Sequence, residues 1–301
     1  MSVVIVNPSS AGGSTGEEWP QIASELRSQF GAFRPVFTKK RGDAATLASE
    51  AARKGAKFII ACGGDGTVSE VANGILSSGK DVELGILPSG TGGDFRRTLE
   101  IPSRTRDAAK ILRTGRTARI DVGRVSYIDH NGNDAMRYFV GVASCGMSTR
   151  VIERVKADHA SFASALLKTA MRNQPVRLVV QLDDAHEHRL VVSNLCVANA
   201  RYFGGGMKIA PDAKLTDGMF DVISVGDLSA MKIFTSAPRV YTGSHLSMPE
   251  VSHALARKIT VKAADSLAEI AMEVDGELPG RLPATFQIIP EALRVRVNDQ
   301  N

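Results

Sequence analysis

A run of glycines interrupted by one acid, GGDGT at residues 63–67, follows the apolar stretch 57–62 and is the clearest candidate for chemistry in the sequence. Glycine lets a backbone come close to a ligand and adopt positive φ, and an anion-binding loop needs both. Thr67 and Glu70 have the T-x-x-E spacing of a capping box, which predicts that a helix begins at Thr67 and directs free N–H groups into the loop. Two interpretations follow: a phosphate cradle, or a strand-to-helix turn in which Asp65 is only a local cap.

Two further glycine-bearing loops, NPSSAGG at 7–13 and PSGTGGD at 88–94, also follow apolar stretches. Short apolar runs alternate here with segments of helical spacing, which predicts a mainly parallel, doubly wound sheet. The expected buried strands are 3–6, 34–37, 57–62 and 82–87, and the expected helices are 17–30, 43–55 and 67–79. Because such sheets bind ligands beyond the carboxyl ends of their strands, the three loops should converge on one crevice. Neither the G-x-G-x-x-G spacing of dinucleotide-binding loops nor the Walker pattern G-x-x-x-x-G-K-[ST] is present.

Beyond about residue 117 the pattern changes to strand-like segments separated by turns. The expected strands are 118–128, 136–146, 176–182, 188–200, 220–226, 258–264 and 284–289. Asn131-Gly132 predicts a two-residue hairpin turn, and helical patterns interrupt the strands at about 147–172 and 229–243. The fold class predicted for the chain is therefore α/β plus β, a doubly wound α/β domain followed by a β-sandwich domain.

The composition is that of a soluble globular protein of 301 residues, a length that suits about two domains. Its apolar runs fall short of the roughly 20 residues of a membrane-spanning helix. Cys62, Cys145 and Cys196 are dispersed in apolar stretches, so we expect buried free thiols in a reducing cytosol rather than disulfides or structural zinc. The net charge of +5 suits an anionic partner, while the aromatic residues offer no platform for nucleic acid.

Five motifs in chain order are NPSSAGG, GGDGTVSEVANGI, PSGTGGDF, GGGMKIAPDAKLTDGMFDV and EVDGE. Together they resemble those of the bacterial diacylglycerol kinase-like lipid kinases, a family that includes sphingosine and ceramide kinases. The resemblance extends from residue 7 to residue 277 and implies ATP bound in an active-site cleft between two domains. We place a nucleotide-binding domain at 1–117 and a lipid-substrate sandwich at 118–290. Residues 291–301 are expected to form a terminal strand that is able to return to the first domain.

The resemblance also implies individual ligand-binding residues. Those implied for the nucleotide are Asn7, Ser10, Gly12, Thr38, Gly64, Asp65, Gly66, Thr67, Val68, Ser69, Glu70 and Thr91. The turn KLTDGMF matches a structural Mg²⁺ site made by the Asp217 carboxylate and the carbonyls of Lys214 and Met219, although Asp-Gly is also a common turn pair. Gly93 stands where many members of the family have asparagine, so we expect altered nucleotide affinity.

Phosphoryl transfer needs a neutralised γ-phosphate, in-line placement and a hydroxyl that loses its proton. Four carboxylates in the family motifs are candidates for this work, namely Asp65, Asp94, Asp121 and Glu277. Asp65 and Asp94 follow successive parallel strands, so a shared crevice is geometrically reasonable. The family pattern makes Glu277 a candidate general base with Asp121 as its competitor, and spacing does not decide between them. We hypothesise that Asp65 and Glu277 are essential.

These inferences describe a cytoplasmic, peripherally membrane-associated enzyme that uses ATP and Mg²⁺ to phosphorylate the hydroxyl of a diacylglycerol-like lipid in phospholipid biosynthesis. Residues 148–172, apolar with basic flanks, fit either an interfacial helix on anionic lipid or a helix packed on the sandwich. The alternatives are an NAD kinase that shares the GGDGT site and a non-catalytic lipid- or nucleotide-binding regulator. The identity of the lipid and the oligomeric state, a homodimer included, stay open.

Overall fold

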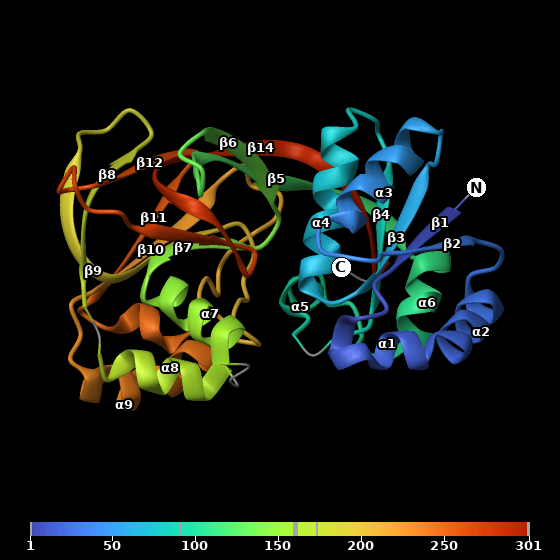
Figure 1. The fold of residues 1–301 in the computed structure, drawn as a ribbon, viewed down its shortest axis with the longest axis horizontal. Helices are drawn as coiled ribbons and strands as arrows, with labels where there is room; N and C mark the ends of the chain where they lie inside the picture. Colours follow the sequence, from blue (N-terminus) through green and yellow to red (C-terminus); the bar gives the residue numbers. More distant parts are fainter. Residues whose placement is uncertain (1, 91, 159–161, 173, 300–301) are drawn as a thin grey trace. The chain divides into compact units, whose positions relative to one another are not determined.

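The computed structural model describes residues 2–90, 92–158, 162–172 and 174–299, which divide into two units (Figure 1). Unit 1 comprises Met1–Val122 together with Pro290–Asn301, and unit 2 comprises Gly123–Ile289. Two strands, β5 (Arg116–Asp129) and β14 (Glu277–Val297), pass from one unit into the other.

Unit 1 is built on a parallel sheet with the strand order β2-β1-β3-β4. These strands are β1 (Ser2–Val6), β2 (Arg34–Phe37), β3 (Phe58–Gly63) and β4 (Glu83–Pro88). The end of β14 pairs with β4 in the same direction and adds a strand at that edge. The strands β1, β3 and β4 are almost wholly buried, as expected for a parallel sheet with both faces covered, so the predicted doubly wound sheet is confirmed.

The strand β2 forms at the predicted residues, but the prediction that it is buried is wrong. Both of its ends are exposed, and Phe37 keeps 46 % of its surface accessible. The reason is its position at the edge of the sheet, where it pairs with β1 alone.

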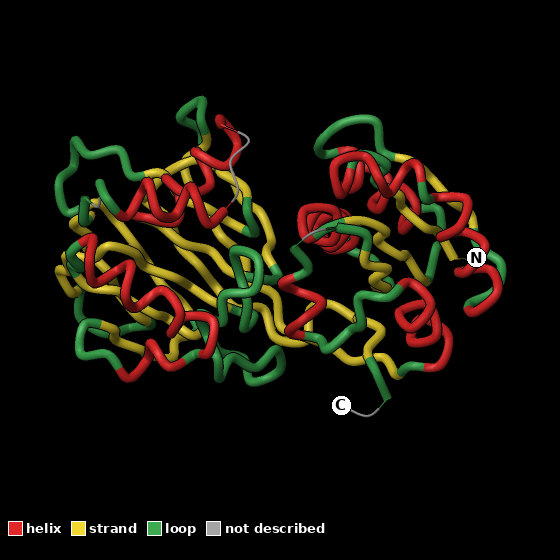
Figure 2. Tube along the Cα trace, turned by 90° about the horizontal axis from the view of Figure 1, so that it is seen from below, coloured by secondary structure: helices red, strands yellow, loops and turns green. Residues whose placement is uncertain are grey.

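The helices of unit 1 form two pairs on opposite faces of the sheet, α3 against α4 and α2 against α6 (Figures 1 and 2). The bounds are α1 (Ser14–Glu17), α2 (Trp19–Gln29), α3 (Asp43–Arg53), α4 (Asp65–Ser77), α5 (Asp94–Thr98) and α6 (Thr105–Thr114), with a 3₁₀ turn at Ser10–Gly13. Gly74 makes the α3–α4 contact possible, because a Cβ there would lie 2.2 Å from the carbonyl oxygen of Ala45.

Unit 2 is an antiparallel structure in which the strand pairing closes on itself, through β7, β9, β8, β12, β14, β13 and back to β7. The strands β10 and β11 extend the sheet beyond β9, and β5 pairs with β6. The bounds are β6 (Asp134–Phe139), β7 (Val142–Gly146), β8 (Val176–Leu182), β9 (His188–Ala198), β10 (Phe220–Gly226), β11 (Val251–Ala256), β12 (Lys258–Ala263) and β13 (Ala271–Val274). The predicted change from an α/β to a β-rich domain is confirmed.

The segment 136–146, predicted as one strand, is divided between β6 and β7. The carboxylate of Asp275 accepts the N–H groups of Val140 and Gly141 at 3.1 and 2.9 Å, and these bonds hold the chain between the two strands. Because Asp275 is about 135 residues away in the chain, no local pattern reveals the break. The strands β11 and β13 were also missed.

The predicted hairpin at Asn131-Gly132 forms between β5 and β6, but its loop is longer than two residues. The Asp129 carboxylate accepts the N–H groups of Asn131 and Asn133, both at 2.8 Å. An aspartate that bonds backbone groups ahead of it stabilises such a wider turn.

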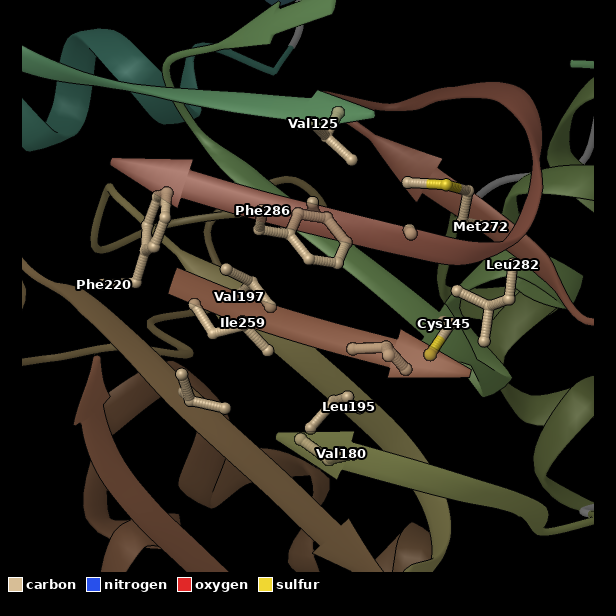
Figure 3. Close-up of a cluster of buried hydrophobic side chains, with 14 of the residues drawn as sticks. Val125, Cys145, Val180, Leu195, Val197, Phe220, Ile259, Met272, Leu282 and Phe286 are labelled. Carbon is tan, nitrogen blue, oxygen red and sulfur yellow. The ribbon is translucent and has the colours of Figure 1, made fainter. Parts of the chain in front are cut away.

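The closed sheet of unit 2 surrounds a core of apolar side chains from most of its strands (Figure 3). Phe139 and Phe220 stack with their ring centroids 5.5 Å apart, and Phe286 meets Phe139 edge-on at 6.2 Å. A Cβ on Gly123 would lie 2.2 Å from the Phe139 ring, so glycine on β5 makes room for this ring.

All three cysteines are buried and free, as predicted. Burial raises the pKa of Cys62 and of Cys145 to about 12. Thiols with such pKa values are not nucleophiles near neutral pH, and these side chains serve as packing residues.

Three α-helices and a 3₁₀ turn at Ser244–Ser247 complete the described part of unit 2; the helices are α7 (Met147–Asp158), α8 (Phe162–Ala170) and α9 (Ala230–Thr242). The single helix predicted at 147–172 is thus two helices, and residues 159–161 between them lie outside the described chain. The helix predicted at 229–243 is confirmed, with the Ser229 side chain capping its start and Gly243, at φ 82°, ending it. Among the described residues, no helix has the length and apolar character needed to cross a membrane.

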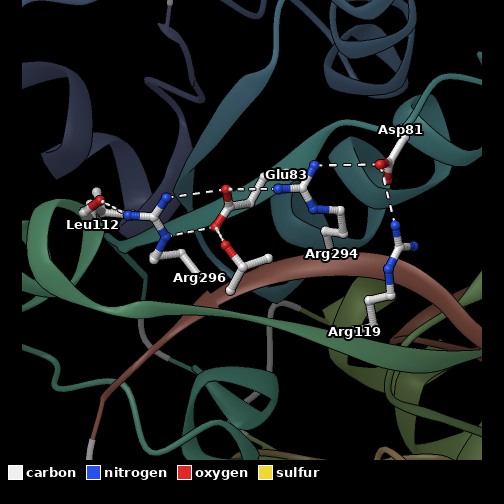
Figure 4. A network of polar contacts seen from close by, with 7 residues as sticks. Asp81, Glu83, Leu112, Arg119, Arg294 and Arg296 are labelled. Carbon is white, nitrogen blue, oxygen red and sulfur yellow. Dashed lines mark hydrogen bonds and ion pairs between the residues drawn. The ribbon is translucent and has the colours of Figure 1, made fainter.

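The return of β14 to unit 1 is held by Glu83, a buried carboxylate at the start of β4 (Figure 4). Arg296 binds its two oxygens at 2.6 and 3.1 Å, and Thr117 donates a hydrogen bond at 2.8 Å. Arg294 lies 3.7 Å away. Burial alone would raise the pKa of Glu83, but the hydrogen bonds from Arg296 and Thr117 and the two arginine charges outweigh it and hold this pKa below its usual value.

We expect Glu83→Gln to lower the free energy of unfolding by about 3 kcal/mol at pH 7, because it leaves the half-buried Arg296 without its counter-charge. The lowered folded-state pKa means that the stability from Glu83 is present above its ordinary pKa of 4.5 and is lost as the pH falls through the lower folded-state value. The variant should therefore lose less stability than the wild type on acidification. Urea unfolding followed by circular dichroism, at neutral pH and at about pH 3, measures both effects.

The matched control is Asp81→Asn. Asp81 pairs with Arg119 and Arg294 in the same network, but 59 % of its side chain is exposed. Its loss should cost less than about 1 kcal/mol. Equal losses for the two variants would contradict a special role for the buried carboxylate.

Candidate functional site

The side chain of Asn7 joins the first two glycine loops of unit 1. Its Nδ2 donates to Thr67 Oγ1 at 3.0 Å, and its Oδ1 accepts from the Ser9 N–H at 3.1 Å and from the Thr38 hydroxyl at 3.4 Å. Asn7, Thr38 and Thr67, all implied for the nucleotide by the family motifs, therefore lie together at the carboxyl ends of β1, β2 and β3.

A chain of hydroxyl groups joins the first loop to the third. Ser10 Oγ lies 2.7 Å from Thr15 Oγ1, and Thr15 Oγ1 lies 2.6 Å from Ser89 Oγ. Thr15 is completely buried. Neither Thr15 nor Ser89 was selected from the sequence, where the only signal was a hydroxyl residue in or beside each loop.

The second and third loops touch through glycines. A Cβ on Gly90 would lie 2.6 Å from Gly64 Cα, so a side chain there would separate the loops. Among the described residues, no atom from elsewhere in the chain lies within 4 Å of a Cβ placed on Gly12 or Gly66. The three loops thus converge, as the strand order predicts, and open backbone remains on two of them.

The capping box predicted at Thr67 and Glu70 is wrong. The helix α4 begins at Asp65, and its N-cap makes no side-chain hydrogen bond. The Glu70 carboxylate instead accepts the N–H groups of Gly42 and Ala44, at 2.9 and 3.1 Å, at the start of α3. Because α3 and α4 pack side by side, a carboxylate of one caps the other.

Asp65 binds the N-terminal N–H groups of α5 with both carboxylate oxygens. Oδ2 accepts from Gly93 at 2.6 Å and from Asp94 at 3.1 Å, while Oδ1 accepts from Phe95 at 3.1 Å. These donors have no partner inside the short helix, whose positive end also favours a negative charge. Asp65 is therefore a helix cap, as one interpretation held, but it caps the helix of the next loop rather than its own.

Asp94 lies beside Asp65 and has its own partner. Its Oδ1 is 2.9 Å from Arg97 Nη1, which also donates to the Gly92 carbonyl at 2.7 Å. The two acids that were expected to share a crevice thus lie close together in unit 1, with Asp94 paired to an arginine.

Asp121 holds another part of unit 1. Its side chain is buried on β5, and Oδ1 accepts the N–H of Glu291 at 2.9 Å. Glu291 has φ 51°, a conformation that few residues other than glycine adopt. Asp121 therefore stabilises an unusual backbone where β14 enters unit 1.

The remaining residues implied for the nucleotide have supporting positions. Val68 and Ser69 are buried within α4, and the Ser10 hydroxyl donates to the Asn7 carbonyl at 2.8 Å. Thr91 lies outside the described residues.

In unit 2, Glu277 is the first residue of β14 and follows a tight turn. Asp275 and Gly276 in this turn have φ values of 49° and 79°. The buried carboxylate of Glu273 accepts the Gly276 N–H at 2.5 Å. This bond, together with those from the Asp275 carboxylate to the β6–β7 connection, fixes the backbone that carries the half-buried Glu277.

An apolar cavity of about 110 Å³ lies in unit 2 among α7, α8, α9 and the neighbouring sheet. Its wall includes Met147, Val151, Leu166, Phe203, Ile233 and Val240. His245 is the largest polar residue in the wall, and its Nε2 lies 2.9 Å from the Ile209 carbonyl. Burial lowers the pKa of His245, so the ring is neutral at pH 7 and the cavity wall carries no charge from it.

A chain of hydrogen bonds connects this cavity to the turn before Glu277. Asn194 and Ser148 line the cavity, and the Ser148 N–H donates to Asn194 Oδ1 at 3.0 Å, which leaves the Ser148 hydroxyl to donate to Ser144. Ser148 Oγ is 2.7 Å from Ser144 Oγ, which donates to the Glu273 carboxylate at 2.5 Å. A group bound at the polar end of the cavity would therefore contact the network that holds the Glu277 turn.

The turn matched to a structural Mg²⁺ is an exposed loop before β10. The Asp217 Oδ1 accepts the Met219 N–H at 3.1 Å, as in an ordinary Asx turn. The pKa of Asp221 is raised by burial first and then by the charges of Asp217 and Asp212, while His253 opposes the shift. Carboxylate and carbonyl oxygens are ligands that Mg²⁺ accepts, but the described residues include no cluster of three or more acidic, histidine or cysteine side chains placed to hold a metal ion, so Asp217 would need backbone carbonyls and water to complete the site.

Two family descriptions match nearly the whole chain. Residues 1–125 match the diacylglycerol kinase catalytic domain, and residues 141–297 match the YegS C-terminal NAD kinase beta sandwich-like domain.

Curated proteins with similar sequences include several diacylglycerol kinases. One from Staphylococcus haemolyticus (strain JCSC1435) is 30 % identical over 94 % of this chain and 84 % of its own. One from Mycobacterium tuberculosis (strain CDC 1551 / Oshkosh) is 32 % identical over 84 % of this chain and 81 % of its own.

Solved structures show the same fold. A diacylglycerol kinase from Bacillus anthracis str. Sterne has a TM-score of 0.74 at 23 % identity, covering 99 % of this chain and 97 % of its own. Another structure from that organism reaches a TM-score of 0.80 at the same identity and coverage. The chain belongs to the diacylglycerol kinase-like family of lipid kinases, and it is a phosphotransferase that acts on an alcohol group.

We expect Asp65→Ala to lower the free energy of unfolding by about 1–2 kcal/mol, since three backbone N–H groups lose their acceptor. Asp65→Asn keeps one acceptor oxygen and should lose about half as much. Urea unfolding measures both values.

Asp43→Ala is the matched control, because Asp43 also accepts two backbone N–H groups, at 2.8 and 3.0 Å, but at an exposed site. Water replaces its bonds more easily, so Asp43→Ala should lower the free energy of unfolding less than Asp65→Ala does. If Asp65→Ala cost no more than this control, Asp65 would not be holding the third loop.

Proposed function

We propose that this kinase transfers the γ-phosphoryl group of ATP to the hydroxyl of a diacylglycerol-like membrane lipid, with Mg²⁺. The observation that carries the proposal is the apolar cavity of unit 2 and its hydrogen-bonded connection, through Ser148 and Glu273, to the turn before Glu277. A lipid acceptor needs an apolar site for its chains and a base near its hydroxyl, and unit 2 contains a candidate for each.

The nucleotide is assigned to the three glycine loops of unit 1. Open backbone at Gly12 and Gly66 allows close approach of phosphates, and the positive end of α4 lies in the second loop. Asn7, Ser10 and Thr38 offer amide and hydroxyl groups in the same region. The proposal also includes Thr91 of the third loop, on the strength of the family motif.

Mg²⁺ bound with ATP neutralises phosphate charge during transfer. We assign Asp65 and Asp94 to the water shell of that ion, because the Asp94 N–H bonds the Asp65 carboxylate and both residues belong to the glycine loops. A second, structural Mg²⁺ is assigned to the Asp217 carboxylate with the carbonyls of Lys214 and Met219.

Glu277 is the proposed base for the lipid hydroxyl. Its competitor Asp121 is buried and already bonded to Glu291, whereas Glu277 is half-buried on a turn fixed by two other carboxylates. The reaction requires Glu277 of unit 2 to reach a hydroxyl beside the nucleotide of unit 1, so residues of both units take part in the proposed reaction.

We also infer a cytoplasmic protein that contacts the membrane peripherally and binds no nucleic acid. The proposed substrate requires the membrane contact, because a diacylglycerol does not leave the bilayer freely.

Transfer of label from γ-labelled ATP should occur to diacylglycerol or a related lipid and should need Mg²⁺. The acceptor panel consists of diacylglycerol, phosphatidylglycerol, sphingosine, ceramide, undecaprenol and NAD. Glu277→Gln should lower kcat by about 100-fold or more, as expected for loss of a general base. The control Glu269→Gln removes a carboxylate that is 75 % exposed in the same unit and should leave kcat unchanged.

Label in NAD but in no lipid would identify an NAD kinase. No label in any acceptor would favour a binding regulator. Wild-type kcat in a folded Glu277→Gln protein would remove Glu277 from the mechanism.

Gly93→Asn should lower the KM for ATP by about two- to tenfold, the effect of one added hydrogen bond. Gly93 has φ 76° and ψ 37°, a left-handed conformation that asparagine accepts more readily than most residues. An added Cβ would lie 2.5 Å from Arg96 Nε, so this side chain, whose Nη1 donates to the Ile101 carbonyl, has to shift. Steady-state kinetics at saturating lipid measure the change.

Gly93→Ala is the control, since it adds the Cβ without the amide and should give no such gain. Equal KM values for wild type, Gly93→Asn and Gly93→Ala would show that this position does not contact nucleotide or its metal-bound water.

A further inference from the structure

The helix α9 carries apolar residues on two faces. Ile233, Ala237 and Val240 line the cavity of unit 2. On the other side, Met231, Phe234, Pro238 and Tyr241 are all exposed and follow one another at helical spacing. We call these four residues the outer stripe.

The outer stripe is an unusual surface for a soluble domain. Met231, Phe234 and Tyr241 expose 72, 62 and 50 % of their surface. The inner face of α9 already supplies the packing that holds the helix, so folding does not explain the apolar outer face. Contiguous exposed apolar residues of this kind mark a contact with a partner or a membrane.

The charges on α8 and α9 themselves are positive, and the exposed acid Asp227 lies just before α9. Neither α8 nor α9 contains an acidic residue, and the exposed cations on and beside them are Lys168, Arg172, Lys232 and Arg239. Lys232 pairs with Glu250, which lies outside these helices. The surroundings of the stripe therefore favour an anionic partner.

The end of α8 adjoins this surface. Ala170 packs against Leu228 and Ile233 near the start of α9. Met171, which is 65 % exposed, and Arg172 follow directly, so one more apolar side chain and one more cation lie beside the stripe.

We propose that the outer stripe, together with Met171, docks this protein on an anionic lipid bilayer. The apolar side chains enter the boundary between headgroups and acyl chains, and the cations bind lipid phosphates. The proposal rests on the lipid kinase function proposed above and adds the place of contact. Since α9 separates the stripe from the apolar cavity by one helix, docking brings the cavity next to the bilayer.

A second copy of the chain is a less suitable occupant. Two such faces brought together would oppose cations with cations, with no acid on α8 or α9 to compensate them. An anionic membrane meets both the apolar and the charged part of the surface.

Flotation with large unilamellar vesicles tests the proposal without any need for catalysis. The vesicles contain equal parts of phosphatidylglycerol and phosphatidylcholine, or phosphatidylcholine alone. The wild type should bind the anionic vesicles more strongly, and added salt should weaken the binding. Met231→Asp combined with Phe234→Asp should lower the partition coefficient between vesicle and water by about tenfold or more. The reason is that two apolar groups that enter the bilayer in the wild type become charged.

Leu267→Asp is the matched control. Leu267 is 89 % exposed in the turn between β12 and β13, outside α8 and α9, and should leave vesicle binding unchanged. Thermal unfolding should be the same for all three proteins, because the substituted side chains are exposed.

Activity on two forms of substrate separates this proposal from the function on which it rests. The stripe variant should phosphorylate a short-chain diacylglycerol in detergent micelles like the wild type, but phosphorylate diacylglycerol in anionic vesicles more slowly. If the protein bound vesicles through the stripe but phosphorylated no lipid, docking would be supported and the proposed lipid kinase function would be contradicted. Equal flotation of wild type and stripe variant would overturn docking. Docking would also be overturned if the wild type were a dimer, the stripe variant were a monomer and both bound vesicles equally. The stripe would then be a subunit interface.

Discussion

The backbone N–H groups at the start of α5 need acceptors from outside that helix, and the Asp65 carboxylate of the neighbouring loop supplies them. The other loop contacts of unit 1 work in the same way, with Asn7 bonded to Thr67 and Thr15 to Ser89. Each glycine loop is thus held by a polar group of another loop, and together they keep open backbone available for phosphates. A change at Asp65 therefore alters the shape of the third loop as well as any chemistry of the carboxylate, and loss of activity alone does not establish a catalytic role.

The strand β14 connects the two units, because it begins in unit 2 and ends in the sheet of unit 1. It begins with Glu277, the proposed base, and ends beside β4 in the sheet that carries the glycine loops. Asp121 and Glu83 are the buried carboxylates that secure its final part, one by a backbone bond to Glu291 and the other by an ion pair with Arg296. A catalytic role is not needed to explain why these acids are buried, because each bonds a polar group of the returning strand.

The proposed lipid site and the proposed membrane surface share one helix. The inner face of α9 lines the cavity, and its outer face exposes Phe234 and the rest of the outer stripe. The polar end of the cavity continues through Ser148 and Ser144 to the Glu273 carboxylate. Unit 2 therefore contains, in sequence, a surface suited to lipid, a cavity suited to an acyl chain and a polar connection to the proposed base.

The sequence by itself determined the α/β-to-β order of the domains, the convergence of the three glycine loops and the burial of Cys62, because strand alternation, helical spacing and apolar runs are local properties of the chain. Tertiary structure decided which groups meet. The spacing of Glu70 predicts a cap for its own helix, but its carboxylate accepts the Ala44 N–H at the start of α3, 26 residues away. Thr15 Oγ1 contacts Ser89 Oγ across 74 residues. The physical reason is that a side chain bonds whichever backbone or hydroxyl group packs beside it, and only the folded arrangement of α3, α4 and the loops brings those groups within reach.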